Sequence, residues 1–243
     1  SARLPIYVLF AQMFFEMHAL LVAYSLYLIG LLVAIGIAYV VHKKAGNEEG
    51  DALLIELPEY KTPNGRTVAI YVWEKVKDYL TKAGTTIFVA SIILWFVLNM
   101  GPEGIVEDVS NSFAAMIGRF LVPVLKPAGL GSWQIAVALI SGLSAKEVVV
   151  SSFSVLYGIS NINSGAGMME LSRILAVDGF RAVNGYALMI FCLMYSPCVA
   201  AIGTIRRETR SISWTTGMVL FQIVMAWVMS VIVYQVGSFL FPI

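Results

Sequence analysis

The sequence predicts an all-α, polytopic transmembrane protein whose helices are interrupted at two places. Hydrophobic residues make up 59% of its 243 residues and charged residues 13%, and the mean hydropathy is +0.82. Soluble domains are nearer to about 45–50% apolar and about 25% charged. Several apolar runs have the length of about 17–25 residues that a helix needs to cross a bilayer. Two of these runs carry helix-breaking or ionisable residues near their middle.

The predicted membrane spans follow from these apolar runs. The clearest spans cover residues 18–41, 84–100, 183–205 and 214–240. Residues 4–16 read as the end of a helix whose beginning lies before the chain. Because the chain also opens at Ser1 without an initiator methionine, we expect it to be a fragment.

The segment 42–83 is hydrophilic and holds seven of the sixteen lysines and arginines. The positive-inside rule therefore places it in the cytoplasm. Between Val68 and Leu80, apolar residues recur at a spacing of three to four, with charged residues between them. This pattern predicts an amphipathic helix on the membrane surface, ending before the chain enters the membrane at Gly84.

A second basic cluster, within residues 206–210, is also expected in the cytoplasm. The region 101–182 must then cross the membrane an even number of times. Either 110–125 and 133–157 both span, or 133–157 enters and leaves as a re-entrant element, and the sequence leaves both open. The polar loop and short amphipathic helix predicted for 158–182 belong on the opposite side from the basic segments.

The first interruption lies at Gly142, within an apolar run. Ser144 and Glu147, three residues apart, form a capping-box pattern for a second half-helix. Glu147 either serves only as a cap, or it lines a transport pathway together with Ser144 and Ser151, which fall on one helical face. Lys146 either neutralises Glu147 or points to a different face.

The second interruption is Tyr195-Ser196-Pro197-Cys198. Pro197 removes one backbone donor and displaces the carbonyl of Leu193. Met194 lies four residues before Cys198, on the same helical face. Sulfur donors suit late divalent metals such as Fe²⁺ better than Mg²⁺ or Ca²⁺. The alternative is that Cys198 is an inert small apolar residue, as we expect for Cys192.

Enzymatic function is not predicted. The sequence has no G-x-x-x-x-G-K-[ST] loop, no Gly-x-Ser-x-Gly elbow and no CxxC pair, so we expect no nucleotide hydrolysis by these residues. The net charge of +1 gives no reason to expect nucleic acid as a partner.

Five motifs, taken in order along the chain, resemble the carboxyl-terminal membrane region of the FeoB ferrous-iron transporters of bacteria and archaea. They are Ser1-Ala2-Arg3-Leu4-Pro5-Ile6-Tyr7, Glu56-Leu57-Pro58-Glu59-Tyr60, Trp73-Glu74-Lys75-Val76 running into Lys82-Ala83-Gly84-Thr85, Leu143-Ser144-Ala145-Lys146-Glu147, and Tyr195-Ser196-Pro197-Cys198 closing with Arg206-Arg207-Glu208-Thr209.

The resemblance implies a transporter that joins a cytoplasmic GTPase domain to two gate repeats and imports Fe²⁺ across the inner membrane. It divides this chain into the end of the first gate with a transmembrane helix, the cytoplasmic linker, the second gate, and a carboxyl-terminal helix. These segments cover residues 1–41, 42–83, 84–210 and 211–243.

The resemblance also makes Cys198 the candidate ligand of a transient Fe²⁺ site. Oxygen donors would complete that site if the two interrupted segments meet. The candidate donors are Cys198, Ser196, Glu147, Ser144 and Met194, with the Leu193 carbonyl as a further oxygen.

No stably bound cofactor is expected. Fe²⁺ would be the transported substrate, and GTP would bind only in the missing domain. The implied partners are membrane lipid, the missing GTPase domain and first gate, small Feo accessory proteins, and a second copy of the chain. Two other functions stay open: a gate-type transporter of nucleosides or small solutes, which would favour Asn, Gln and Ser in its site, and a membrane scaffold that transports nothing.

Overall fold

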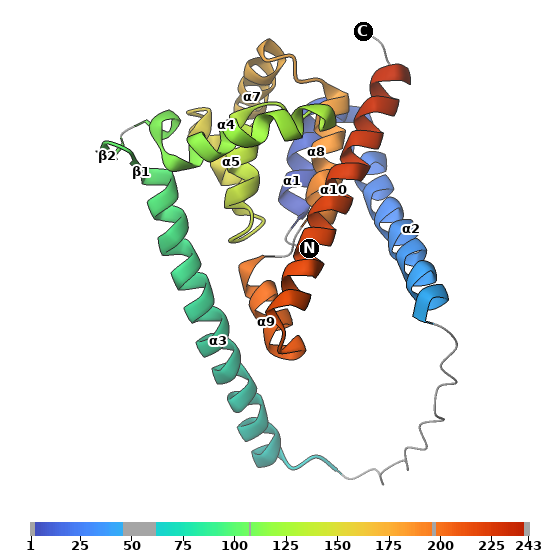
Figure 1. Ribbon diagram of the computed structural model, residues 1–243, viewed down its shortest axis with the longest axis vertical. Helices are drawn as coiled ribbons and strands as arrows, with labels where there is room; N and C mark the ends of the chain where they lie inside the picture. Colours follow the sequence, from blue (N-terminus) through green and yellow to red (C-terminus); the bar gives the residue numbers. More distant parts are fainter. Residues whose placement is uncertain (1–2, 46–61, 107, 196–197, 241–243) are drawn as a thin grey trace. The chain divides into compact units, whose positions relative to one another are not determined.

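The structure is a computed structural model that describes residues 3–45, 62–106, 108–195 and 198–240. Figure 1 shows a chain of helices joined mostly by short connections. The helices are α1 (Leu4–Phe15), α2 (Ala19–Ala45), α3 (Gly65–Asn99), α4 (Phe113–Leu125), α5 (Trp133–Ser141), α6 (Val148–Leu156), α7 (Gly165–Val177), α8 (Ala182–Met194), α9 (Val199–Thr209) and α10 (Ile212–Leu240).

The predicted fold class is confirmed. A small antiparallel pair, β1 (Met100–Gly101) and β2 (Gly104–Ile105), adds to the helices. Within the described residues, three stretches are long and apolar enough to cross a membrane, and a bent helix pair would make a fourth. The three are Leu4–Lys44, Ala182–Thr209 and Ile212–Leu240. The expected span 84–100 is not among them, and its crossing stays a prediction.

The expected end of the amphipathic helix before Gly84 is wrong. α3 runs without a break from Gly65 to Asn99. One glycine in a helix costs about 1 kcal/mol relative to alanine, which is too little to end a long helix. Thr85 also donates its hydroxyl to the Thr81 carbonyl at 2.8 Å, one turn earlier in the same helix. The amphipathic segment is thus the first part of a longer helix.

The chain packs into two compact units. One contains Ser1–Leu26 and Thr86–Ile243, and the other contains Tyr27–Thr85. Both interrupted segments belong to the first unit. The division into four segments made from the sequence stays a prediction.

α8 lies at the centre of the first unit, where it packs against α1 and α10 (Figure 1). Its residues from Ala187 to Cys192 are all buried. Ser230 of α10 donates its hydroxyl to the Ala187 carbonyl at 3.0 Å. On the side of α1, the ring of Phe10 meets that of Phe153 edge-on, with centroids 5.5 Å apart. The first of these contacts joins α10 to α8, and the second joins α1 to α6.

α4 and α5 form the bent pair, with an angle of 101° between Phe113–Ala128 and Trp133–Ser141. Gly129 makes the turn with φ +73°, in the left-handed region that favours glycine. The indole N–H of Trp227 in α10 donates to the Val124 carbonyl at 2.7 Å and so ties α4 to α10.

The region 133–157 forms two helices of nine residues, α5 and α6, which pack against each other. Each is about 14 Å long, whereas the hydrocarbon core is about 30 Å thick. Neither helix crosses a bilayer alone, and the chain turns back between them (Figure 1). This arrangement favours the re-entrant alternative.

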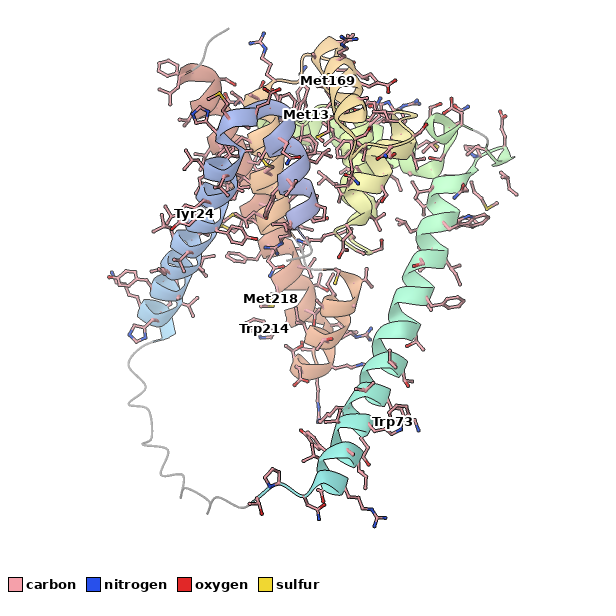
Figure 2. All side chains as sticks on the ribbon, turned by 180° about the vertical axis from the view of Figure 1, so that it is seen from behind. Met13, Tyr24, Trp73, Met169, Trp214 and Met218 are labelled. Atoms are coloured by element: carbon pink, nitrogen blue, oxygen red, sulfur yellow. The ribbon has the colours of Figure 1, made fainter. Side chains whose placement is uncertain are left out.

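Large apolar side chains cover the outside of the long helices. Figure 2 shows Tyr24 on α2, Trp73 on α3 and Trp214 on α10 projecting from their helices, and they are 67%, 68% and 69% exposed. Apolar surface of this extent marks contact with a membrane or with other proteins, and aromatic side chains favour the membrane interface. The protein is a multi-pass membrane protein.

Candidate functional site

The first interruption lies between α5 and α6. α5 ends at Ser141, and α6 begins only at Val148. The hydroxyl of Ser144 donates to the Ser141 carbonyl at 2.7 Å, and so gives a hydrogen-bond partner to the last carbonyl of α5. The predicted interruption at 142–144 is present.

The predicted capping box is wrong. The residue that precedes α6 is Glu147 itself, and its side chain makes no capping hydrogen bond. Because α6 starts later than the sequence pattern suggested, Ser144 lies inside the turn and bonds backward to α5. Glu147 is exposed.

The second interruption lies between α8 and α9. α8 ends at Met194, and Tyr195 and Cys198 both have extended backbone, with ψ of 166° and 159°. α9 then begins at Val199. Ser196 and Pro197 lie outside the described residues, so the effect of the proline on the Leu193 carbonyl and the position of the candidate donor Ser196 stay predictions. The residues on either side show the break.

The two interrupted segments meet. The backbone N–H of Val199, the first residue of α9, donates to the carbonyl of Leu143 at 2.8 Å. Gly142 packs directly against the hydroxyl of Tyr195, with no room for a side chain between them. We call this meeting point, formed by residues 142–147 and by Tyr195, Cys198 and Val199, the junction.

A buried lysine crosses the junction. Lys146 is only 6% exposed. Its ammonium lies 3.2 Å from the Tyr195 carbonyl oxygen and 3.5 Å from that of Cys192, and 4.3 Å from the centre of the Tyr195 ring. These carbonyls belong to the carboxyl-terminal end of α8, where the helix carries partial negative charge. Of the two alternatives for Lys146, the structure supports the one in which it points away from Glu147.

This role of Lys146 was not predicted from the sequence. The available signal was a lysine in an apolar run, which is a functional hypothesis by default. Its partners could not be found from the sequence, since they lie 46 and 49 residues further along the chain.

The predicted metal donors lie around the junction with different exposures. Cys198 precedes α9 and is half-buried, as are Met194 at the end of α8 and Ser144 in the first break. Cys192, expected to be structural, is fully buried in α8. Within the described part of the chain, no group of three or more His, Cys, Asp or Glu side chains could hold a metal ion.

The sequence matches two family models. Residues 80–212, more than half of the chain, match the Gate family, described as "Nucleoside recognition". The chain belongs to the Gate family. Residues 23–75 match the model "Ferrous iron transport protein B C terminus". Both breaks, and the contacts between them, fall within the Gate match.

Curated relatives place this Gate chain in the membrane region of FeoB proteins. It is 38% identical over 237 residues to the Fe(2+) transporter FeoB of Staphylococcus aureus (strain MSSA476), covering 98% of the chain and 34% of the relative. It is 35% identical over 249 residues to that of Methanocaldococcus jannaschii, covering 99% and 36%.

A third relative is the Fe(2+) transport protein A/Fe(2+) transporter FeoB fusion protein of Porphyromonas gingivalis. It is 30% identical over 282 residues, covering 99% of the Gate chain and 33% of the relative. The chain thus spans about a third of the length of these relatives, and their GTPase portion is not covered by it. No solved structure matches the chain significantly.

Proposed function

We propose that this chain forms the carboxyl-terminal part of the Fe²⁺ pathway in a FeoB-type importer of the cytoplasmic membrane. The observation that carries the proposal is the junction. Two segments interrupted at membrane depth meet through the bond from Val199 N–H to the Leu143 carbonyl. Non-helical backbone is tolerated there only where it is covered by protein or lines a cavity, and transporters place their binding sites at such breaks.

The proposed ion site combines one soft donor with oxygen donors. The thiol of Cys198 is the soft ligand that favours Fe²⁺ over Mg²⁺ or Ca²⁺. Met194, Ser144 and Glu147 are the other candidates, and Ser196, outside the described residues, remains a further one. A coordination shell in which protein side chains supply only some of the ligands suits a transported ion. Such an ion must bind tightly enough to enter the site and weakly enough to leave it.

A second candidate, transport of a small polar solute, has one observation in its favour. A cavity of about 670 Å³ is lined by Ser132, Gln134 and Asn184 among others. These side chains are already engaged, however. Ser132 donates to Gln134, and Asn184 donates to the Gly129 carbonyl at 2.7 Å and accepts from Arg181 N–H at 3.0 Å. The lining of this cavity includes no residue of the junction, so Fe²⁺ is the better candidate.

The proposed partners follow from the length of the relatives. Since the chain spans about a third of their length, a GTPase domain and a first gate in the same protein would complete the transporter. Small Feo proteins are further candidates, because the Porphyromonas relative is itself a fusion with a Fe(2+) transport protein A. A second copy of the chain is the remaining one.

The test is the Cys198→Ser substitution in the full-length transporter. We expect Fe²⁺ uptake under reducing conditions to fall while GTP hydrolysis is retained, because serine keeps the shape but removes the soft ligand. The matched control is Cys192→Ala, which alters the other cysteine inside the core of α8. Unchanged uptake by Cys198→Ser at equal expression would show that this thiol is an inert side chain.

A second readout uses the chain alone. Co²⁺ bound to a thiolate gives a charge-transfer absorption band, and this band should appear with the unmodified chain and disappear with Cys198→Ser. Nucleoside binding to the same chain, measured separately by calorimetry, distinguishes the two candidate functions, since only a solute site would bind it.

A further inference from the structure

Lys146 places a positive charge in a buried position. The side chain is 6% exposed, and its ammonium is held by two backbone carbonyl oxygens and one aromatic ring. Burial of a charge is strongly unfavourable unless other groups compensate it. The compensating groups here are the α8 end carbonyls of Cys192 and Tyr195 and the face of the Tyr195 ring.

None of these compensating groups is specific for an ammonium. Backbone carbonyl oxygens replace the hydration shell of metal cations in channels, and aromatic faces attract cations in general. The end of a helix adds a partial negative charge of its own. The two carbonyls and the ring therefore form a cation site, which we call the α8 carbonyl site, and Lys146 occupies it in this structure.

The surroundings of the site have an unused oxygen. Tyr195 is 4% exposed, and its hydroxyl oxygen has no hydrogen-bond partner among the described residues. It faces Gly142 on the other segment of the junction. A buried hydroxyl without a partner is unfavourable, and this oxygen belongs to the same ring that the Lys146 ammonium contacts.

We propose that Lys146 is a tethered cation that competes with the transported ion for the α8 carbonyl site. This proposal rests on the proposed function. When Fe²⁺ is bound at the junction, repulsion between the ion and the ammonium moves Lys146 away, and the two carbonyl oxygens become available to the metal. When the ion leaves, Lys146 returns and closes the site without any other residue moving into it.

The exchange would also contribute to selectivity. The binding free energy of an ion at this site must outweigh that of the contacts made by Lys146. A monovalent cation gains less electrostatic energy from the same oxygens than a divalent one. An ion that also binds the Cys198 thiol gains more. Lys146 therefore raises the affinity that an ion needs in order to occupy the site, and this favours a soft divalent ion.

The test is Fe²⁺ binding to the 243-residue chain in detergent, measured by calorimetry under anaerobic, reducing conditions. Lys146→Met removes the charge and keeps the length of the side chain. We expect it to tighten Fe²⁺ binding by about tenfold or more, because the competing charge is gone. The matched control is Lys126→Met, which removes an exposed lysine of the same unit and should leave binding unchanged. Equal or weaker binding by a folded Lys146→Met chain would overturn the proposal.

The two hypotheses fail in different ways. If Cys198→Ser leaves Fe²⁺ binding unchanged while Lys146→Met tightens it, the role of Cys198 is refuted and the competition stands. If Cys198→Ser weakens binding while Lys146→Met has no effect, the ion site stands and Lys146 is only a structural cap of α8.

A measurement on the unmodified chain covers the case in which Lys146→Met does not fold. Modification of Lys146 by an imidoester can be followed by mass spectrometry, with Lys126 as an internal reference. We expect the modification of Lys146 to accelerate when Fe²⁺ is added and that of Lys126 to stay constant. A rate for Lys146 that does not respond to Fe²⁺ would exclude displacement.

Discussion

Replacement of Gly142 by alanine should separate the two segments of the junction. A Cβ atom at this position would collide with the Tyr195 hydroxyl and with a methyl group of Val149, and it would lie 3.4 Å from the Leu139 carbonyl oxygen. The backbone itself accepts alanine, since Gly142 has φ −66° and ψ −10°. The effect therefore measures the close contacts of Gly142 with Tyr195 and Val149 and not the strain of the turn, and the Tyr195 part is isolated below by a second substitution.

The magnitude follows from two opposing terms. Overpacking of a close contact costs about 1–3 kcal/mol. The lower conformational entropy of unfolded alanine relative to glycine returns about 0.4–1 kcal/mol. We expect a net destabilisation of about 1–2 kcal/mol.

The assay is thermal or denaturant unfolding of the purified chain in detergent, with Gly217→Ala as the matched control. Gly217 lies inside α10, and nothing lies within 4 Å of the position that a Cβ atom would take there, so alanine should stabilise by up to about 1 kcal/mol. Adding Tyr195→Phe to Gly142→Ala removes the oxygen that the new methyl group meets and should restore part of the stability. The contact would be refuted if the Gly142→Ala chain were as stable as the unmodified one. It would also be refuted if the double variant were no more stable than Gly142→Ala alone.

Three further predictions concern topology and the packing around α8. Cysteines introduced at 158–182 should react with a membrane-impermeant reagent from the side opposite to one introduced at Lys43, and labelling from the same side would contradict the assigned topology. Asn184→Ala should destabilise by about 1–3 kcal/mol in an unfolding assay, because the buried Gly129 carbonyl loses its 2.7 Å partner. Ser230→Ala should cost about 0.5–1.5 kcal/mol through loss of its bond to α8, and should leave Fe²⁺ binding unchanged.

The two interruptions were predictable from the sequence because their causes are local. Gly142 together with Ser144, which bonds to the Ser141 carbonyl, and the Tyr-Ser-Pro-Cys motif each act on the few residues around them, whereas Gly84 alone does not break α3. The capping box was not predictable in the same way. Whether Ser144 caps α6 or closes α5 depends on the residue at which α6 starts, and packing of α6 against α5 decides that start.

The continuity of α3 and the role of Lys146 lay beyond the sequence for different physical reasons. At Gly84 the local penalty is small, and helical hydrogen bonding on both sides of one glycine outweighs it. Lys146 has an ordinary local sequence, and only the tertiary contact between the α5–α6 turn and the end of α8 gives it partners.

The bond that joins the two segments of the junction runs from main chain to main chain, between Val199 N–H and the Leu143 carbonyl oxygen. Every residue except proline carries both of these groups, so nearly any side-chain replacement at these two positions leaves the bond in place. The side chains of the proposed ion site can therefore be exchanged without loss of the bond that joins the two segments. Exchange of the donor side chains on an unchanged backbone is thus a practical route to altered selectivity of the proposed site.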